Sequence, residues 1–395
     1  MTKPRTAIIA GGGIAGTVAA IALHRAGFTA LLQEAYPADT DERGAFLTVA
    51  VNGLAALRAL DLDPAELLAA GYPTPTVRLG NGAGRVLATL PLGGPQPDGT
   101  TTTTIRRADL YAALRAAATK CGVAIGYEKR LVGLAERDGG VTATFADGSA
   151  VDGDVLIGAD GLNSRTRTLL NPDAPAPRYL GLLNAGGFTA GGIDADFDRT
   201  PGVVSMAFGK RSFFGWSAAA DGSVWWFANP PRKRPIEPRD WTEASWRAHL
   251  LELFAGDAIP ATAIIRATGE VLGPWNTYDL PSVGVWRSGR TVLIGDAAHA
   301  ASPSSGQGAS MAMEDAVTLG RCLAGQPDVP AALAGYEELR RARVERVVAY
   351  GRRNGSAKTA GPVGRVIRDA MMPPLLRFLY RNGNPQSWIL DHRVR

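Results

Sequence analysis

The N-terminal part of the chain alternates between short apolar runs and a helical pattern. Residues 6–10 are an apolar run before a glycine cluster, residues 14–26 are rich in alanine and larger apolar side chains, and residues 29–33 are apolar again. Gly27 stands where a helix commonly ends in a left-handed residue. A strand, a helix and a second strand within about 30 residues predict a βαβ unit.

Further helices and strands of the same kind are predicted before residue 160. Helices are predicted where apolar residues recur every three or four positions, at 52–60, 65–70 and 107–121. Strands are predicted from apolar runs at 123–127, 131–136, 141–145 and 155–159. The pair Asp147-Gly148 predicts a hairpin turn.

The pattern changes between about residues 178 and 280, where aromatic and β-branched runs alternate with glycine and proline. These runs lie at 205–208, 213–218, 224–229 and 264–267. Asp221-Gly222 is again typical of a hairpin turn. We expect the runs to form an antiparallel sheet inserted into the α/β domain.

The α/β pattern returns near residue 290. Residues 291–294 predict a buried strand, 307–323 a helix and 333–352 a long helix with many arginines. Residues 361–395 predict helices broken by Pro373-Pro374 and Pro385, because proline interrupts a helix interior. We therefore divide the chain into an α/β domain (1–71, 101–177 and 281–330), a sheet domain (72–100 and 178–280) and C-terminal helices (331–395).

The composition is that of an ordinary folded protein of 395 residues, because 46% of the residues are hydrophobic and 20% are charged. No apolar stretch approaches the ~18 residues of a membrane span, and the N-terminus reads as a strand rather than a signal peptide. Cys121 and Cys322 are too few for a disulfide framework and favour the cytoplasm. The four histidines have no metal-ligand spacing, so no metal is expected.

The net charge of +5 is unevenly distributed. Residues 337–395 contain 13 basic and 5 acidic side chains, a local charge of +8. We expect a solvated helix face there, and no nucleic-acid binding, because the rest of the chain is slightly acidic.

The first chemical motif is Gly11-Gly12-Gly13-Ile14-Ala15-Gly16, which follows a strand and opens a helix. Glycines at this spacing let the backbone approach a pyrophosphate at the helix N-terminus. Glu34 ends the next strand, 18 residues after Gly16, where a carboxylate can accept hydrogen bonds from ribose hydroxyls. Together they predict a dinucleotide site, whereas the glycines alone would also fit an ordinary turn.

Two further strand-to-turn motifs carry an acidic residue. Asp160 follows the strand at 155–159 in an Ala-Asp-Gly turn, and Asp296 follows the strand at 291–294. A glycine-rich loop and a helix come after Asp296, and such a helix N-terminus can stabilise a negative charge on a ring system above it. Either motif could also be ordinary turn chemistry.

In this order, the three turns resemble the single-component, FAD-dependent aromatic monooxygenases of the para-hydroxybenzoate hydroxylase type. The chain resembles the branch that contains the tetracycline-inactivating monooxygenases and similar natural-product enzymes. The resemblance spans about residues 6–346 and includes Ile105-Arg106-Arg107-Ala-Asp-Leu. It implies a Rossmann-type FAD-binding domain with an inserted antiparallel-sheet substrate domain and a C-terminal helical segment.

The resemblance also implies roles for individual residues. The glycine motif from Gly11 to Gly16 would hold the FAD pyrophosphate, and Glu34 the adenosine ribose. The other expected FAD contacts are Arg43, Arg106, Asp160, Asp296, Pro303, Gly306, Gly308 and Ala309. Of these, Asp160 would also help to bind NAD(P)H, Asp296 would bind the ribityl chain, and the residues from 303 onward would line the isoalloxazine ring.

The implied reaction uses NAD(P)H and O2 to insert one oxygen atom into a bulky aromatic or polycyclic small molecule, through a hydroperoxide at C4a of the flavin. Natural-product biosynthesis or antibiotic modification is the expected setting. Because the cofactor carries this chemistry, no nucleophile or acid–base pair is required of the protein. We expect His299 to pack near the flavin and orient backbone rather than act as a base.

Aromatic side chains of the inserted sheet are the candidate substrate contacts. The candidates are Arg211, which could bind a substrate oxyanion, and Phe214, Trp216 and Trp226. Strand alternation directs Phe213, Trp225 and Phe227 to the opposite side. One side should pack and the other should line a pocket, and the alternation does not distinguish them.

Two other functions stay open: a flavin reductase or oxidase that inserts no oxygen, and a non-catalytic nucleotide-fold binder. The complete loop at 295–309 favours a flavin enzyme. A serine hydrolase and a flavin halogenase are disfavoured, because the Gly-x-Ser-x-Gly and Trp-x-Trp-x-Ile-Pro motifs are absent. The chain is expected to be a monomer or a homodimer.

Overall fold

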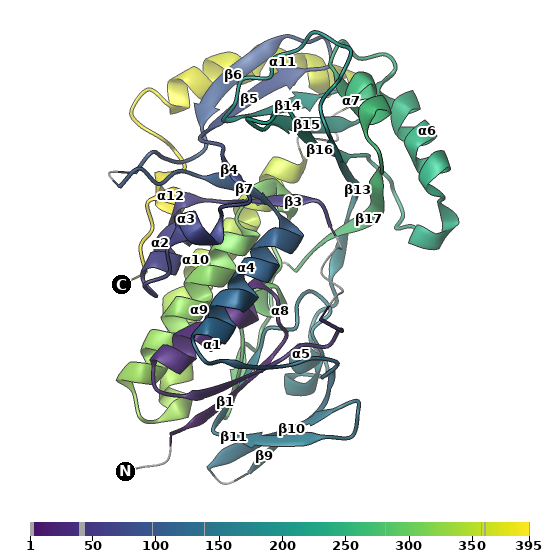
Figure 1. Cartoon of the computed structure of the whole chain (residues 1–395). Helices are drawn as coiled ribbons and strands as arrows, with labels where there is room; N and C mark the ends of the chain where they lie inside the picture. The colour runs from purple at the N-terminus through teal and green to yellow at the C-terminus, as the bar shows by residue number, and fades with distance from the viewer. Residues whose placement is uncertain are drawn as a thin grey trace.

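A six-stranded sheet forms the centre of the lower half of the molecule in Figure 1. The computed structural model describes residues 4–38, 44–96, 98–137, 139–280, 282–356, 358 and 361–394. The strand order is β18 (Arg287–Ser288), β19 (Thr291–Leu293), β12 (Val155–Gly158), β1 (Thr6–Ala10), β2 (Thr29–Gln33) and β8 (Ala124–Gly126). All neighbours are parallel except β18 and β19. The carboxyl ends of β1, β2, β12 and β19 therefore meet at one border, which we call the strand-end edge.

Helices bury this sheet on one side. The central helix α1 (Ile14–Arg25) is buried from Ile14 to Leu23 because its residues are apolar on every side, and it packs against α9 (Gly308–Gly325). The other helices of this half are α2 (Val51–Arg58), α3 (Pro64–Leu67), α4 (Arg107–Lys120), α5 (Arg165–Leu170), α8 (Asp296–His299), η3 (Pro303–Ser305) and α10 (Val329–Ser356). Together with the sheet, they enclose the largest apolar core of the described residues.

A three-stranded antiparallel sheet covers the other side of the strands. It consists of β9 (Leu131–Arg137), β10 (Gly140–Phe145) and β11 (Ala150–Gly153). Val141 and Phe145 pack against Ile8 and Leu156 of the parallel sheet. The predicted turn at Asp147-Gly148 is confirmed, because Gly148 has a φ of +84° between β10 and β11.

The upper half of the molecule is a seven-stranded sheet. Its order is β17 (Leu272–Asp279), β13 (Arg178–Thr189), β16 (Val224–Asn229), β15 (Phe213–Ala218), β14 (Val203–Phe208), β5 (Thr76–Asn81) and β6 (Val86–Pro91). The sheet is mixed rather than wholly antiparallel, because β5 runs parallel to β14. The division of the chain into domains stays a prediction.

One predicted strand of this region is wrong. Residues 264–267 belong to the helix α7 (Ala261–Ala267), which packs against α6 (Glu243–Phe254). A short 3-10 helix, η2 (Pro238–Asp240), comes before α6 in the chain. Ala261, Ile264 and Ile265 are buried together, and this spacing of three and four residues is helical. The run at 264–267 contains two adjacent isoleucines and is too short to show a helical period by itself, so it was predicted as a strand.

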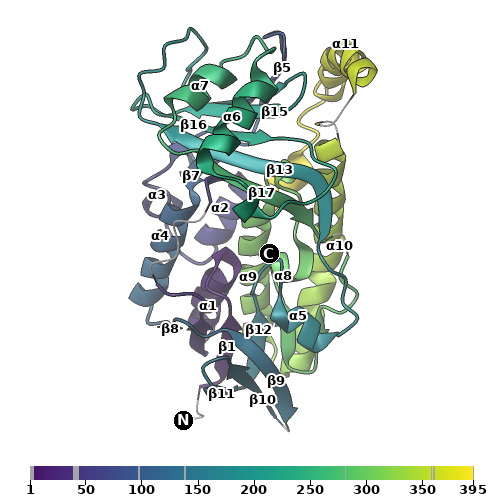
Figure 2. The same ribbon diagram turned by 90° about the vertical axis from the view of Figure 1, so that its right-hand side faces the viewer.

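The two halves are joined by a small sheet and by the C-terminal helices. The small sheet has the order β3 (Phe46–Val49), β7 (Thr103–Arg106) and β4 (Tyr72–Pro73). Figure 2 shows the long α10 rising from the lower half towards α11 (Pro362–Leu379), which lies by the upper sheet. The predicted break at Pro373-Pro374 is wrong, because α11 continues through both prolines.

A last short helix, α12 (Ser387–Leu390), returns to the lower half, where it contacts α2. None of the helices described has the length and apolar character needed to cross a membrane.

Candidate active site

Three acidic side chains and the glycine motif gather at the strand-end edge. The motif follows β1, Glu34 follows β2, Asp160 follows β12 and Asp296 follows β19. Because these four strands are parallel neighbours, residues up to 285 positions apart reach one border of the sheet. The carboxyl ends of parallel strands are where α/β folds bind ligands.

Three of the four glycines of the motif, Gly11, Gly13 and Gly16, differ in the space around them. A Cβ on Gly11 would lie 2.4 Å from the Ala159 carbonyl oxygen, and one on Gly16 would lie 1.8 Å from the Gly11 carbonyl oxygen. Gly13, in contrast, has only the Tyr111 hydroxyl nearby, at 3.9 Å. Gly11 and Gly16 are thus required by close packing, whereas Gly13 leaves room beside the N-terminus of α1, where a phosphate would fit.

Glu34 is held by backbone groups at the end of β2. The Gly12 N–H donates to Oε2 at 2.6 Å, and the Tyr36 N–H donates to Oε1 at 2.9 Å. These bonds fix the carboxylate beside the glycine motif. A carboxylate in this place can accept hydrogen bonds from ribose hydroxyls, which fits a dinucleotide.

Asp160 organises the turn after β12. Its Oδ1 accepts a hydrogen bond from the Ser164 hydroxyl at 2.5 Å, and its Oδ2 accepts from the Thr166 N–H at 2.8 Å and hydroxyl at 2.9 Å. These bonds tie the carboxylate to the start of α5. Asp160 therefore stabilises the turn by hydrogen bonds to Ser164 and Thr166, which is one of the two roles expected from the sequence.

Asp296 is exposed at the first position of α8. The surrounding protein nevertheless raises the pKa of this carboxyl by desolvating it, while His299 and Arg107 oppose that rise. The Gly295 N–H just before it donates to Asp315 at 3.0 Å, which fixes the turn. Asp296 is thus a free acceptor at a defined place, suited to hydroxyl donors of a ligand.

The loop from Pro303 to Ala309 leaves its backbone accessible. Pro303 begins η3, Gly306 has a φ of +62°, and α9 starts at Gly308. A Cβ on Gly306 or Gly308 would meet nothing within 4 Å. A flat ring can therefore approach the N-terminus of α9, whose dipole stabilises negative charge on it.

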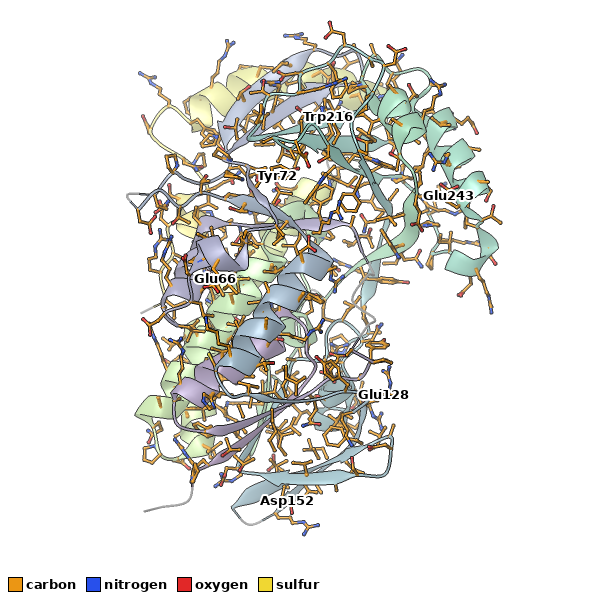
Figure 3. All side chains as sticks on the ribbon, in the orientation of Figure 1. Glu66, Tyr72, Glu128, Asp152, Trp216 and Glu243 are labelled. Atoms are coloured by element: carbon orange, nitrogen blue, oxygen red, sulfur yellow. The ribbon has the colours of Figure 1, made fainter. Side chains whose placement is uncertain are left out.

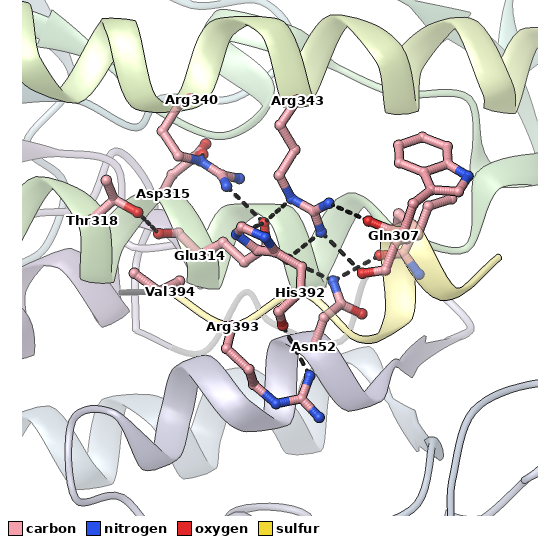
Figure 4. A network of polar contacts seen from close by, with 12 residues as sticks. Asn52, Gln307, Glu314, Asp315, Thr318, Arg340, Arg343, His392, Arg393 and Val394 are labelled. Carbon is pink, nitrogen blue, oxygen red and sulfur yellow. Dashed lines mark hydrogen bonds and ion pairs between the residues drawn. The ribbon is translucent and has the colours of Figure 1, made fainter.

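His299 ends α8, ahead of this loop, and pairs with the buried Asp315. Figure 4 shows the neighbouring network of buried charges around Glu314, Asp315, Arg340 and Arg343. The His299 Nε2 is bonded to Asp315, and its ring lies 5.6 Å from the Trp286 ring. Asp315 is also bound by Arg340 at 2.7 Å. Burial disfavours the Asp315 carboxylate, but His299 and Arg340 outweigh it and hold the pKa at about 2. His299 is therefore tied through Asp315 to the backbone of the Gly295 turn.

Sequence reasoning missed the rest of this network. Arg340 and Arg343 of α10 bind Glu314 of α9 at 2.7 and 2.8 Å, and Glu314 is fully buried. Asn52 also donates to Glu314 at 2.8 Å. The expectation of a solvated face is wrong for Arg340, which is 2% exposed. Two adjacent acidic residues, Glu314 and Asp315, in an otherwise apolar helix could have predicted this network, because buried carboxylates need positively charged or hydrogen-bonding partners.

Two consecutive arginines at the start of α4 point to different places. The Arg107 Nε donates to the Tyr111 hydroxyl at 2.8 Å. Burial opposes the charged guanidinium, but Tyr111 and, to a smaller extent, Asp296 raise the pKa of Arg107. The Arg106 guanidinium lies over the rings of Phe188 and Trp225, at 4.5 and 5.4 Å. Arg107, which the sequence analysis did not select, is therefore the arginine beside the glycine motif and Asp296.

The seven-stranded sheet has aromatic side chains on both faces, and the two faces pack against different parts of the protein. The outer face carries Phe214, Trp216 and Trp226, which pack into a core with α6 and α7. Trp226 is fully buried, stacks on Phe214 at 5.4 Å and donates to Thr268 at 2.8 Å. Three of the predicted substrate contacts are therefore core residues. Figure 3 places Trp216 within the upper half, above Tyr72 at the junction of the halves.

The inner face carries Phe213, Trp225 and Phe227, and Phe46 and Arg106 of the small sheet lie against it. Phe46 of the small sheet contacts Trp225 at 5.7 Å and Phe227 at 6.1 Å, measured between ring centroids. Gly215 lets the Phe227 ring lie across β15, because a Cβ there would sit 2.3 Å from that ring. The inner face therefore adjoins the site of Arg106 and Arg107.

Two basic residues, Arg211 and Lys358, lie beside this sheet. Arg211 pairs with Glu252 at 3.1 Å on the surface and does not reach the inner face. Lys358, between α10 and α11, donates to the Asn229 side chain at 2.6 Å, and its amine lies 4.3 Å from the centre of the Phe213 ring. Burial lowers the pKa of Lys358 to about 7. Arg43 lies outside the described residues.

Comparison with known proteins agrees with this geometry. Residues 5–350 match the FAD binding domain family. The aurachin C monooxygenase/isomerase of Stigmatella aurantiaca is 33% identical over 354 residues, which cover 89% of this chain and 88% of that protein. The 6-hydroxynicotinate 3-monooxygenase of Bordetella bronchiseptica is 32% identical over 360 residues, covering 87% and 90%.

A solved structure of an FAD-containing protein has a similar fold. The crystal structure of Klebsiella pneumoniae HpxO complexed with FAD and uric acid is 27% identical in sequence, with a TM-score of 0.80, and the match covers 94% of this chain and 93% of that one. The glycine motif, the exposed Asp296 and the accessible loop before α9 fit FAD. The chain therefore belongs to the FAD binding domain family and is an FAD-dependent monooxygenase.

Proposed function

We propose that the protein hydroxylates an aromatic ring that bears an ionisable oxygen, such as a phenol or an aromatic carboxylic acid. The observation that carries this proposal is the inner face, where the Lys358 amine lies against the rings of Phe213 and Phe227. Phe227 is only partly buried and offers a flat apolar contact beside the buried Phe213 and Trp225, and Lys358 offers a positive charge there. Two of the proteins named above support it: one is a 6-hydroxynicotinate 3-monooxygenase, and the HpxO structure contains uric acid, and both small molecules are ring compounds with ionisable groups.

The proposed substrate would lie between the inner face and the loop before α9. Aromatic side chains stack on substrate rings at offset or edge-on angles, which orients the ring without fixing its identity. The Lys358 ammonium would then select the oxygen-bearing end of the ring. Arg106 lies at the other side of the same aromatic group, over Phe188 and Trp225, and would close the pocket there.

We also propose how the chain holds FAD. The glycine motif and Arg107 would bind the pyrophosphate, Glu34 the ribose and Asp296 the ribityl chain, while Pro303, Gly306, Gly308 and Ala309 would line the ring. Arg107 takes this place rather than Arg106, because it lies beside Tyr111 and Asp296. FAD, once bound, supplies the oxygen-transfer chemistry, and NAD(P)H is the electron donor typical of the family.

The protein's own part is to orient the substrate ring, exclude water and hold charge at fixed positions. Asp315, kept ionised by His299 and Arg340, would hold the Gly295 turn in place and with it Asp296. We propose the cytoplasm as the location, since Cys121 and Cys322 are both free.

An isotope experiment tests the proposed reaction. The FAD-loaded enzyme is supplied with NADPH or NADH and a panel of mono- and bicyclic aromatics, with matched members that carry or lack a hydroxyl or carboxylate. We expect faster NAD(P)H oxidation only with the oxygen-bearing members, and one heavy oxygen atom in the product under ¹⁸O2. Product labelled only from water would contradict oxygen insertion, and equal turnover of the unsubstituted rings would contradict the role of Lys358.

A further inference from the structure

The helix α11 exposes its apolar side to solvent. Seven of the eleven large hydrophobic side chains that are exposed among the described residues lie on this one helix. They are Val363 (74% exposed), Val366 (70%), Ile367 (58%), Met371 (58%), Leu375 (52%), Phe378 (71%) and Leu379 (45%). Their spacing of three and four residues makes a continuous stripe along α11. We call these seven residues the α11 stripe.

The side of the same helix that carries Arg365, Arg368 and Asp369, together with Met372, faces the protein. Arg365 donates to the Lys210 carbonyl, Arg368 lies 4.3 Å from the centre of the Phe208 ring, and Asp369 accepts a hydrogen bond from Asn81 at 2.8 Å. An ordinary surface helix turns its charges outward and its apolar residues inward. The reversed orientation of α11 is held by specific polar contacts, so the outward apolar stripe is a fixed feature of the surface.

We propose that the α11 stripe is the interface of a homodimer, in which α11 packs against α11 of a second copy. At roughly 100 Å² of exposed surface for each side chain, the stripe offers on the order of 700 Å² per chain, close to the ~800 Å² that each partner buries in a stable complex. It exceeds the few hundred Å² of the usual exposed apolar patch. A two-fold interface uses the same patch on both copies, and an uninterrupted apolar stripe is complementary to itself.

Charge placement favours this partner. Arg377 is the one charged residue exposed on α11. If Met371 lies on the two-fold axis of an antiparallel pair, the two copies of Arg377 are 12 residues apart along the pair, or about 18 Å at 1.5 Å per residue. A membrane-surface helix instead presents basic residues on its polar face to the lipid headgroups. Here Arg365 and Arg368 on that face are bound to the protein itself.

The experiment measures the mass of the full-length FAD-loaded protein by light scattering after gel filtration. We expect twice the chain mass of 41.4 kDa at micromolar concentration. The double variant Ile367→Glu with Met371→Glu should become monomeric while it retains its FAD and its NAD(P)H oxidation. Leu339→Glu is the matched control, because Leu339 is a single hydrophobic residue of α10 that is 65% exposed, and this variant should stay dimeric.

Cross-linking tests the geometry separately. In a chain with Cys121→Ser and Cys322→Ser, Met371→Cys should form an intermolecular disulfide under mild oxidation, and Leu339→Cys should not. A monomeric wild-type protein, or a dimer that survives the double glutamate variant, would overturn the proposal. So would a monomer that floats with phosphatidylcholine–phosphatidylglycerol vesicles through the α11 stripe, because a membrane would then be the partner.

Discussion

The strand-end edge and the inner face meet at Arg106 and Arg107, but the first consists mainly of backbone groups and the second of side chains. The strand-end edge is mostly backbone, with Gly11 and Gly16 packed against carbonyl oxygens and Gly13 open. The inner face is made of side chains from separate strands, with Lys358 from a distant segment. A local motif can encode a backbone site, whereas a side-chain surface depends on the register of strands far apart in sequence.

This difference leads to separable mutants. Changes at the strand-end edge should alter FAD binding and leave the aromatic surface intact. Changes on the inner face should alter substrate binding and leave FAD in place. A variant that affects both properties equally would indicate that the two regions do not have separate tasks.

The largest effect is expected for Gly13→Val. The backbone φ of Gly13 is −74°, which valine tolerates, and a Cβ there meets only the Tyr111 hydroxyl at 3.9 Å. The variant should fold but bind FAD at least ~100-fold more weakly, because the new side chain takes the place of the pyrophosphate. Flavin absorbance of the purified protein and a thermal melt of the FAD-free form measure the two effects.

The control for Gly13 is Gly16→Val, which should fail to fold because its Cβ would lie 1.8 Å from the Gly11 carbonyl oxygen. If Gly13→Val bound FAD normally, the phosphate would have to lie elsewhere.

A second, smaller effect should distinguish the two faces of the seven-stranded sheet. Trp226→Ala removes a fully buried outer-face ring and a hydrogen bond to Thr268, and should lower the free energy of unfolding by about 3–5 kcal/mol. Phe227→Ala on the inner face, where the ring is only partly buried, should destabilise the protein less and weaken substrate binding more. Chemical denaturation and substrate titration of each variant measure this, and the same loss of stability in both would remove the distinction between the faces.

The sequence predicted the strand-end edge better than the inner face for a physical reason. Gly11 and Glu34 follow an apolar strand directly and Asp296 follows one within three residues, so each reaches the end of its own strand. Strand alternation separated Trp225 from Trp226 correctly, but the side that packs is decided by α6 and α7, which lie elsewhere in the sequence. The orientation of α11 could not be predicted for a similar reason, because an amphipathic pattern does not show which side of a helix faces the protein.

A third prediction separates the two arginines at the junction. Arg107→Met should weaken FAD binding by roughly tenfold to a hundredfold, which corresponds to the ~1.5–3 kcal/mol of a charged hydrogen bond. Arg106→Met should leave FAD affinity almost unchanged, because its guanidinium lies over Phe188 and Trp225 instead. Fluorescence titration of FAD into the two FAD-free variants decides between them, and the reverse ranking would return the FAD contact to Arg106.

The smallest predicted effect is a pH dependence at the inner face. Burial lowers the pKa of Lys358 to about 7, so the amine is charged below pH 7 and neutral above it. An aromatic carboxylate that remains ionised from pH 6 to 9 should therefore bind most tightly at pH 6, and its affinity should fall as the pH rises through 7, by about tenfold overall. The perturbation of the flavin absorbance on substrate binding measures this affinity without turnover.

Two substitutions at Lys358 make this test decisive. Lys358→Arg keeps its charge over the whole range, so tight binding should persist up to pH 9. Lys358→Met has no charge to lose and should bind weakly at every pH, while its FAD content stays that of the wild type because the residue contacts Phe213 and Asn229 rather than the strand-end edge. If the methionine variant kept the pH dependence of the wild type, another group would be responsible, and Lys358 would be only a packing residue of the inner face.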